Sequence, residues 1–205
     1  MPLTYTALGD SLSAGVGATF SSGYAQRYAQ ILENLYHTPV QLHIHAKPKI
    51  TTTDLLQLLS HPLVKRDIAT ANFITISIGS NDLLQANRVF MKQKDPWILE
   101  EAYFHFQQNM HHIIHELIHI HSQTNHAPFM IQIPGLYNPY PQLPHSEPWI
   151  QKFNAVLQAL NSPAVRYVDL HDAFAHHGKK VLSYGIHPNG KGYQLIAERL
   201  RETLP

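Results

Sequence analysis

The positions of apolar residues along the chain predict strands and helices in alternation. Five apolar or alternating segments bounded by turn residues predict strands, over residues 3–8, 40–46, 71–78, 128–133 and 164–168. Apolar residues at helical spacing predict helices over residues 24–36, 51–59, 97–122, 149–160 and 189–204. Because strands that are separated by helices are joined by parallel crossovers, the pattern predicts an α/β fold. We expect a three-layer α/β/α sandwich around a five-stranded parallel sheet.

Two remaining stretches lack a clear hydrophobic period. Residues 83–96 are expected to be irregular and to form a flap beside a ligand site. Residues 134–148 hold five prolines and are expected to be mainly loop. No internal repeat or linker interrupts the chain, so the sequence predicts a single domain over residues 1–205.

The amino-acid composition excludes several classes of protein. The chain has 205 residues, no cysteine and a formal net charge of +1 with its histidines neutral. Disulfides and cysteine chemistry are therefore excluded, and the sequence lacks the clustered basic excess of a nucleic-acid-binding protein. No apolar run approaches the ~20 residues of a membrane span, and the N-terminus lacks the pattern of a signal peptide. We expect a cytoplasmic protein without a membrane span.

The candidate chemistry begins at Gly9-Asp10-Ser11-Leu12, directly after the first predicted strand. Ligands of open parallel sheets bind at the carboxyl ends of the strands. A serine at such a turn exposes its hydroxyl, while its own backbone N–H can join a cluster of donors. Turns also favour Gly, Asp and Ser for conformational reasons alone, so this stretch by itself leaves both interpretations open.

Two further stretches favour the chemical interpretation. Gly79-Ser80-Asn81-Asp82 follows the most apolar predicted strand, and His187-Pro188-Asn189 precedes the last predicted helix. With these three motifs in this order, the chain resembles the SGNH (GDSL) family of esterases and lipases over nearly its whole length. The resemblance implies a flavodoxin-like SGNH hydrolase fold and ester hydrolysis without a metal or a cofactor.

The resemblance also implies roles for single residues. Ser11 would be the nucleophile and His187 the general base, while the Ser11 N–H and the Asn81 side-chain amide would hold the oxyanion. The residue types suit these roles, because a serine is inert near neutral pH until an imidazole takes its proton, and Asn offers a neutral N–H donor. Asp10 and Asp82 are expected to be structural acceptors of backbone N–H groups.

Two positions depart from the family pattern. The family has an Asp three residues before the histidine, where this chain has Tyr184. A tyrosine hydroxyl is neutral at pH 7 and cannot balance an imidazolium. The site is therefore either a Ser–His dyad or an atypical triad, with His187 oriented by Tyr184, by a backbone carbonyl, or by a carboxylate such as Asp169 or Asp172. For these two aspartates a role in a turn or a cap is the stronger expectation.

The second departure is Lys49, which stands where the family has a glycine that donates its backbone N–H to the oxyanion. Lysine retains the N–H but is less free than glycine to adopt a positive φ. Its ammonium would favour an oxyanion and keep His187 neutral if it lay near the site. Alternatively, Lys49 is a solvated loop residue. The sequence leaves both possibilities open.

The 97–122 helix is rich in histidine, and His111, His115 and His119 recur at a spacing of four residues. Histidines at this spacing can chelate zinc, nickel or copper. The segment lacks the glutamate of a zinc-protease motif, and the polar face of a helix must be filled by some residue. A solvated face is the favoured interpretation, and no metal site is expected.

These observations predict a serine esterase that acts on a small ester substrate. Short acyl chains are favoured because no large apolar lid is evident. The alternative from another functional class is a binding module of the same fold, with a degraded triad, for a glycan or an ester-bearing ligand. Tyr184 and Lys49 are the residues that motivate this alternative.

Overall fold

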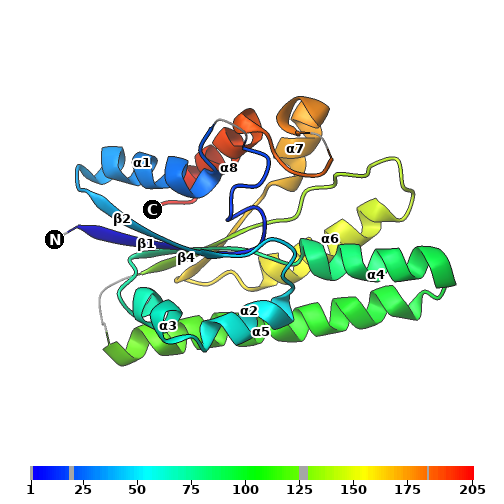
Figure 1. The fold of residues 1–205 in the computed structure, drawn as a ribbon, viewed down its shortest axis with the longest axis horizontal. Coiled ribbons are helices and arrows are strands. Elements are labelled where there is room, and N and C mark those ends of the chain that lie inside the picture. The colour runs from blue at the N-terminus through cyan, green and yellow to red at the C-terminus, as the bar shows by residue number, and fades with distance from the viewer. Residues whose placement is uncertain (1, 19–20, 125–128, 184) are drawn as a thin grey trace.

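The computed structural model describes residues 2–18, 21–124, 129–183 and 185–205 (Figure 1). Its sheet has five parallel strands in the order β2-β1-β3-β4-β5, which confirms the predicted α/β fold. The strands are β1 (Leu3–Gly9), β2 (Val40–Ala46), β3 (Phe73–Ser77), β4 (Met130–Pro134) and β5 (Val165–Val168). The helices are α1 (Tyr24–Tyr36), α2 (Thr52–Leu59), α3 (Pro62–Ala69), α4 (Ser80–Gln93), α5 (Trp97–Thr124), α6 (Ser146–Ala159), α7 (His171–His177), the short η1 (Gly178–Val181) and α8 (Gly190–Glu202).

Helices cover both faces of the sheet and make the three layers. In Figure 1, α1, α7 and α8 lie above the sheet, while α2, α3 and α5 lie below it. The buried apolar side chains accordingly form two clusters, one on each side of the sheet. All five residues of β3, the central strand, are buried, as expected for a strand that is covered on both faces.

The prediction for residues 83–96 was wrong, because most of this stretch belongs to helix α4. The helix begins after Gly79, whose φ of 105° turns the chain sharply from β3, and it ends at Lys94 with a φ of 59°. Ala86 is its only buried residue. Its leucines Leu83 and Leu84 line a pocket, and only Leu83 also packs against the core, so the sequence shows no full core-facing stripe.

Other boundaries also differ from the sequence prediction. Helix α6 begins at Ser146, three residues before the predicted start at residue 149. Helices α3 and α7, with eight and seven residues, were not predicted, although the equally short α2 was. The long helix α5 was predicted within two residues of its observed end.

The parallel register brings the carboxyl ends of β1, β2 and β3 to one edge of the sheet. Gly9, the last residue of β1, pairs with Ala46 of β2 and with Ser77 of β3. Gly9 has a φ of 134°, and a Cβ at this position would lie 2.0 Å from the Ser77 carbonyl oxygen. Only glycine therefore fits where the chain leaves β1 for the turn that carries Ser11.

Within the ranges that the structure describes, none of the helices combines the length and the apolarity that a membrane crossing needs. Even α5, with 28 residues, carries histidine along its exposed side.

Candidate active site

The fold brings Ser11 and His187 together across 176 positions of sequence. The Nε2 atom of His187 lies 3.1 Å from the Ser11 Oγ, a hydrogen-bonding distance. Both residues are half-buried. Partial burial lowers the pKa of His187, so the imidazole is held in the neutral form that can accept the serine proton.

The side chain of Asp10 stabilises the turn that carries Ser11. The Asp10 Oδ1 atom accepts hydrogen bonds from the Leu12 N–H at 3.0 Å and from the Ser77 hydroxyl at 3.2 Å. The backbone N–H of Asp10 donates to the Ser77 carbonyl at 2.9 Å. Burial raises the pKa of Asp10 to about 6, although its hydrogen bonds partly oppose the shift. Asp10 is thus a structural acceptor of the turn, bonded to β3.

Beneath the turn lies a buried network of hydroxyl groups that the sequence analysis missed. The Ser13 Oγ atom donates to the Leu8 carbonyl at 2.8 Å and lies 2.6 Å from the Tyr24 hydroxyl and 2.7 Å from the Ser77 Oγ. The Ser13 N–H also donates to the Ser77 Oγ at 3.1 Å.

The same network continues into the sheet. The Tyr24 hydroxyl lies 3.2 Å from the Thr75 Oγ1, which in turn lies 2.8 Å from the Tyr5 hydroxyl. The available signal was the pair Thr75 and Ser77, two hydroxyl residues on one face of an otherwise apolar strand. This network ties the Ser11 turn to α1 and to β3.

Asn81 lies in the first turn of α4, beside the Ser11 turn. Its side-chain amide donates to the Ile50 carbonyl at 2.9 Å through Nδ2. An amide nitrogen carries two hydrogens, so this bond orients the group and leaves a second donor available.

Lys49 lies in the loop between β2 and α2 and adopts a φ of 73°. Lysine thus occupies the left-handed region that the family's glycine would enter without strain. Like Ser11, Lys49 lines the pocket described below. Within the described ranges, neither the Ser11 N–H nor the Lys49 N–H donates to another protein group, so both are available to a ligand.

Asp82 fixes the Lys49 loop against α4. Its carboxylate accepts hydrogen bonds from the Thr52 N–H at 3.1 Å and from the Thr52 hydroxyl at 2.5 Å. Burial raises the pKa of Asp82 to about 6. Because Asp82 follows Asn81 directly, it couples the two elements that carry Asn81 and Lys49.

Two of the groups considered for orienting His187, Asp169 and Asp172, are bonded to His171 instead. Asp169 accepts from the His171 N–H at 2.8 Å, and the Asp172 carboxylate lies 3.0 Å from the His171 Nδ1. Neither forms a hydrogen bond or an ion pair with the His187 ring; Asp169 lies just before α7, and Asp172 lies in its first turn. Tyr184 lies outside the described residues. Among the described residues, only Ser11 forms a hydrogen bond with the His187 ring.

The backbone around His187 is held at several points. The Ser183 N–H donates to the His187 carbonyl at 2.8 Å, and the Tyr137 hydroxyl donates to the Ile186 carbonyl at 2.5 Å. The Asn189 side chain caps α8 by accepting from the Lys191 and Gly192 N–H groups. The predicted turn and helix start after His187 are therefore present.

A pocket of about 340 Å³ opens beside Ser11 and His187. Its walls come from α4, the start of α5, the start of α6 and the loop between β4 and α6, a stretch that was predicted to be mainly loop. Its apolar lining includes Leu83, Leu84, Leu99, Leu136, Leu143, Trp149 and Ile150. Its polar lining includes Lys49, Asn81, Asn87, Arg88, Asn138 and His145.

The described residues contain no group of three or more His, Cys, Asp or Glu side chains placed to hold a metal ion. The rings of His115 and His119 stack on the exposed side of α5, with centroids 6.3 Å apart. His119 Nε2 lies 2.8 Å from the Gln123 side-chain amide.

Comparison with known proteins gives a consistent result. The family described as "GDSL-like Lipase/Acylhydrolase family" matches residues 7–195. The spore germination lipase LipC of Bacillus licheniformis is 35% identical over 204 residues, which cover 98% of this chain and 96% of the relative. YpmR of Bacillus subtilis is 28% identical, with 98% and 81% covered.

Solved structures agree with this comparison. The lipase Lip_vut3 from a goat rumen metagenome superposes with a TM-score of 0.92 at 34% identity, covering 98% of this chain and 96% of that one. The acetylxylan esterase Axe2 of Geobacillus stearothermophilus shares the fold, with a TM-score of 0.69 at 17% identity and coverages of 98% and 93%.

Proposed function

Because this chain belongs to the GDSL-like lipase/acylhydrolase family, we propose that it hydrolyses carboxylic esters through an acyl-enzyme on Ser11, with His187 as general base. The observation that carries this proposal is the 3.1 Å contact between the Ser11 Oγ and the His187 Nε2 at one end of an apolar pocket. The lowered pKa of His187 supports it, because only a neutral imidazole can take the serine proton near neutral pH.

In the first step the Ser11 Oγ attacks the ester carbonyl carbon, and its proton passes to the His187 Nε2. The carbonyl oxygen becomes an oxyanion, which in this proposal accepts hydrogen bonds from the Ser11 N–H, the Lys49 N–H and the Asn81 amide. The tetrahedral intermediate then expels the alcohol, which takes the proton from His187. A water molecule attacks the acyl-enzyme with His187 again as the base, and the carboxylic acid leaves.

We propose short acyl groups as substrates, from acetyl to hexanoyl. A volume of about 340 Å³ lies at the lower end of the range of about 300–1,000 Å³ for small-molecule sites. The lining residues Leu99, Leu136 and Ile150 are buried in the core, which limits how far the pocket extends. Initial rates for an ethyl ester series test this preference, and a steady rise of kcat/KM beyond hexanoyl would contradict it.

The test of the mechanism is intact-mass analysis after incubation with a fluorophosphonate. We expect one adduct on the native chain and none on Ser11→Ala. Mass analysis is preferable to an activated-ester assay, because sixteen imidazoles hydrolyse activated esters without any active site. The absence of an adduct from pH 5 to 9 would instead favour a binding module of this fold.

A further inference from the structure

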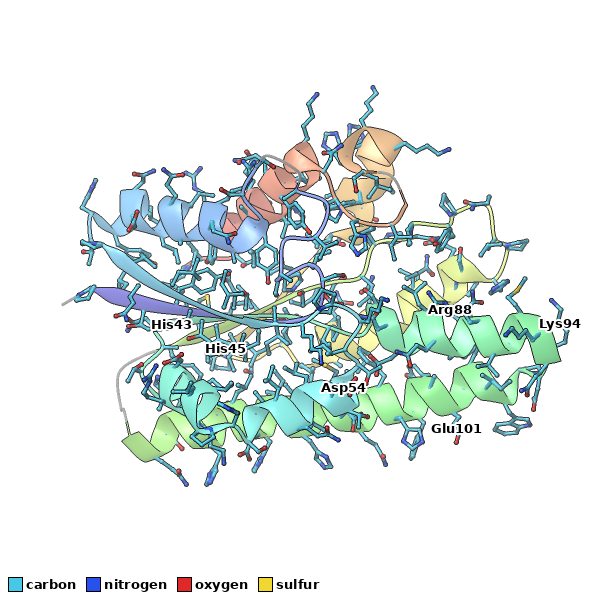
Figure 2. All side chains as sticks on the ribbon, in the orientation of Figure 1. His43, His45, Asp54, Arg88, Lys94 and Glu101 are labelled. Carbon is cyan, nitrogen blue, oxygen red and sulfur yellow. The ribbon has the colours of Figure 1, made fainter. Side chains whose placement is uncertain are left out.

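Arg88 stands out among the residues that line the pocket. It lies on α4, where Figure 2 labels it, and its side chain is largely exposed. In the part of the chain that the structure describes, Arg88 forms no ion pair and no side-chain hydrogen bond. A guanidinium carries five N–H donors in a planar fork that matches a carboxylate or a phosphate.

The helical register places Arg88 in line with Asn81. The two residues are seven positions apart on α4, about two turns, so they lie on the same face of the helix at a separation of about 10 Å. Leu84 lies between them and also lines the pocket. An arginine on a helix points back toward the N-terminus, which brings the Arg88 guanidinium closer than 10 Å to the Asn81 end.

The charges around the pocket leave Arg88 without an internal partner. Asp10 is the only carboxylate among the lining residues, and it is buried and bonded to Leu12 and Ser77. Glu147 lies behind the wall, where its carboxylate accepts from the Asn138 amide at 2.9 Å and pairs with His171 at 2.7 Å. The other cation of the lining is Lys49, at the Ser11 end.

We propose that Arg88 recognises an anionic group on the ester substrate, separated from the ester by a short apolar chain. This inference rests on the proposed function. The ester carbonyl would lie at Ser11 and Asn81, the chain along Leu84, and a carboxylate or phosphate at Arg88. An extended chain spans about 3.5 Å for every three bonds, so roughly five to eight bonds separate two groups that lie less than about 10 Å apart.

The charge can belong to the acyl portion or to the alcohol portion of the ester, and two matched pairs of unactivated esters distinguish them. Ethyl hexanoate and monoethyl hexanedioate differ by an anion on the acyl portion. Hexyl acetate and 6-acetoxyhexanoate differ by an anion on the alcohol portion. Acid release at constant pH gives kcat/KM for each, and the rate of Ser11→Ala is subtracted.

We expect the native enzyme to prefer the anionic member of one pair, and Arg88→Gln to reduce that anionic-to-neutral ratio about tenfold. Arg88→Lys should restore part of the ratio, because a point charge replaces the fork. Added salt should lower the native ratio. The matched control is Lys92→Gln, which removes the same charge one turn further along α4, outside the pocket, and should leave the ratio unchanged.

The proposal is overturned if Arg88→Gln leaves both ratios unchanged, or if Lys92→Gln changes them equally. If no ester shows Ser11-dependent hydrolysis, the proposed function fails, and the anion site is tested by binding. Trp149 lines the pocket, so its fluorescence in a Trp97→Phe background reports ligand binding. The first pair of amide ligands is 6-acetamidohexanoate (anionic) and N-hexylacetamide (neutral). The second pair is the half-amide of hexanedioate (anionic) and hexanamide (neutral). A preference for an anionic amide that Arg88→Gln abolishes supports the site, and no such preference overturns it.

Discussion

The two halves of the Ser11–His187 pair are held in different ways. The Ser11 turn rests on a buried network in which the Ser13 hydroxyl contacts a carbonyl and two other hydroxyls. The His187 ring forms a hydrogen bond only with Ser11 among the described residues. Its segment is held by the Ser183 N–H and by the Tyr137 hydroxyl, which donate to backbone carbonyls. The nucleophile is therefore positioned by the core of the protein, whereas the base is positioned by a surface segment.

This difference predicts that activity and stability depend on different residues. His187→Ala should reduce kcat for an unactivated ester by about 10⁴-fold or more, because the serine loses its base. The free energy of unfolding should change by less than about 1 kcal/mol, since the ring is half-buried and makes one hydrogen bond. Acid release at constant pH and urea denaturation measure the two effects. A large loss of stability would show that the base is also part of the core.

Ser13→Ala tests the opposite half of the comparison. It removes the shared partner of Tyr24 and Ser77 in a buried site, which should cost about 1–3 kcal/mol of unfolding free energy. Ser122→Ala is the matched control, because the Ser122 hydroxyl is exposed and bonds only its own helix, at the His119 carbonyl. It should change stability by less than about 0.5 kcal/mol. Equal effects of the two substitutions in urea denaturation would contradict a special role for the network.

The pH profile tests the protonation state of the base, in a range where Asp10 and Asp82 also titrate, because burial raises the pKa of each to about 6. The base must be neutral, so kcat/KM should rise with pH through the pKa of His187 and then level off. Because burial lowers that pKa, the midpoint should lie below the ordinary value of about 6.5. The measurement is kcat/KM for an unactivated ester between pH 4.5 and 8, in the range where the fold is retained. A midpoint above 6.5 would indicate an anion beside the ring, and Tyr184 would then not be the group that faces it.

The same contrast explains what the sequence could and could not predict. The strands were predicted because segments such as that of β3 are mainly apolar, and motifs after β1, after β3 and before α8 pointed to Ser11, Asn81 and His187. The prediction failed for α4, whose leucines line a pocket, with only Leu83 also packing against the core. Sequence spacing also could not show that Asp169 and Asp172 bond to His171, because the direction of a side chain depends on how α7 packs.

The buried network was invisible for a related reason. Ser13 and Tyr24 read as a turn residue and an apolar helix residue, and only the approach of α1 to the sheet brings their hydroxyl groups together. The sequence also could not show whether the turn at Lys49 needs a positive φ, and the observed φ of 73° shows that it does.

Lys49→Gly should have the smallest effect, yet it decides between the two interpretations of this residue. A lysine in the left-handed region destabilises the fold by about 1–2 kcal/mol, and glycine removes this strain. The greater freedom of glycine in the unfolded chain offsets about 0.5–1 kcal/mol of the stabilisation. We therefore expect the unfolding free energy to rise by about 0.5–1 kcal/mol. Urea denaturation measures this change.

The matched control is Lys94→Gly, because Lys94 has a φ of 59° at the far end of α4, as Figure 2 shows. Both substitutions should stabilise the fold, and Lys94→Gly should leave kcat/KM unchanged. If Lys49 contributes only its backbone N–H, Lys49→Gly should also keep kcat/KM within about threefold, less than 1 kcal/mol. A larger fall that is absent from Lys94→Gly, and that shrinks as salt is added, would assign the Lys49 ammonium a part in holding the oxyanion.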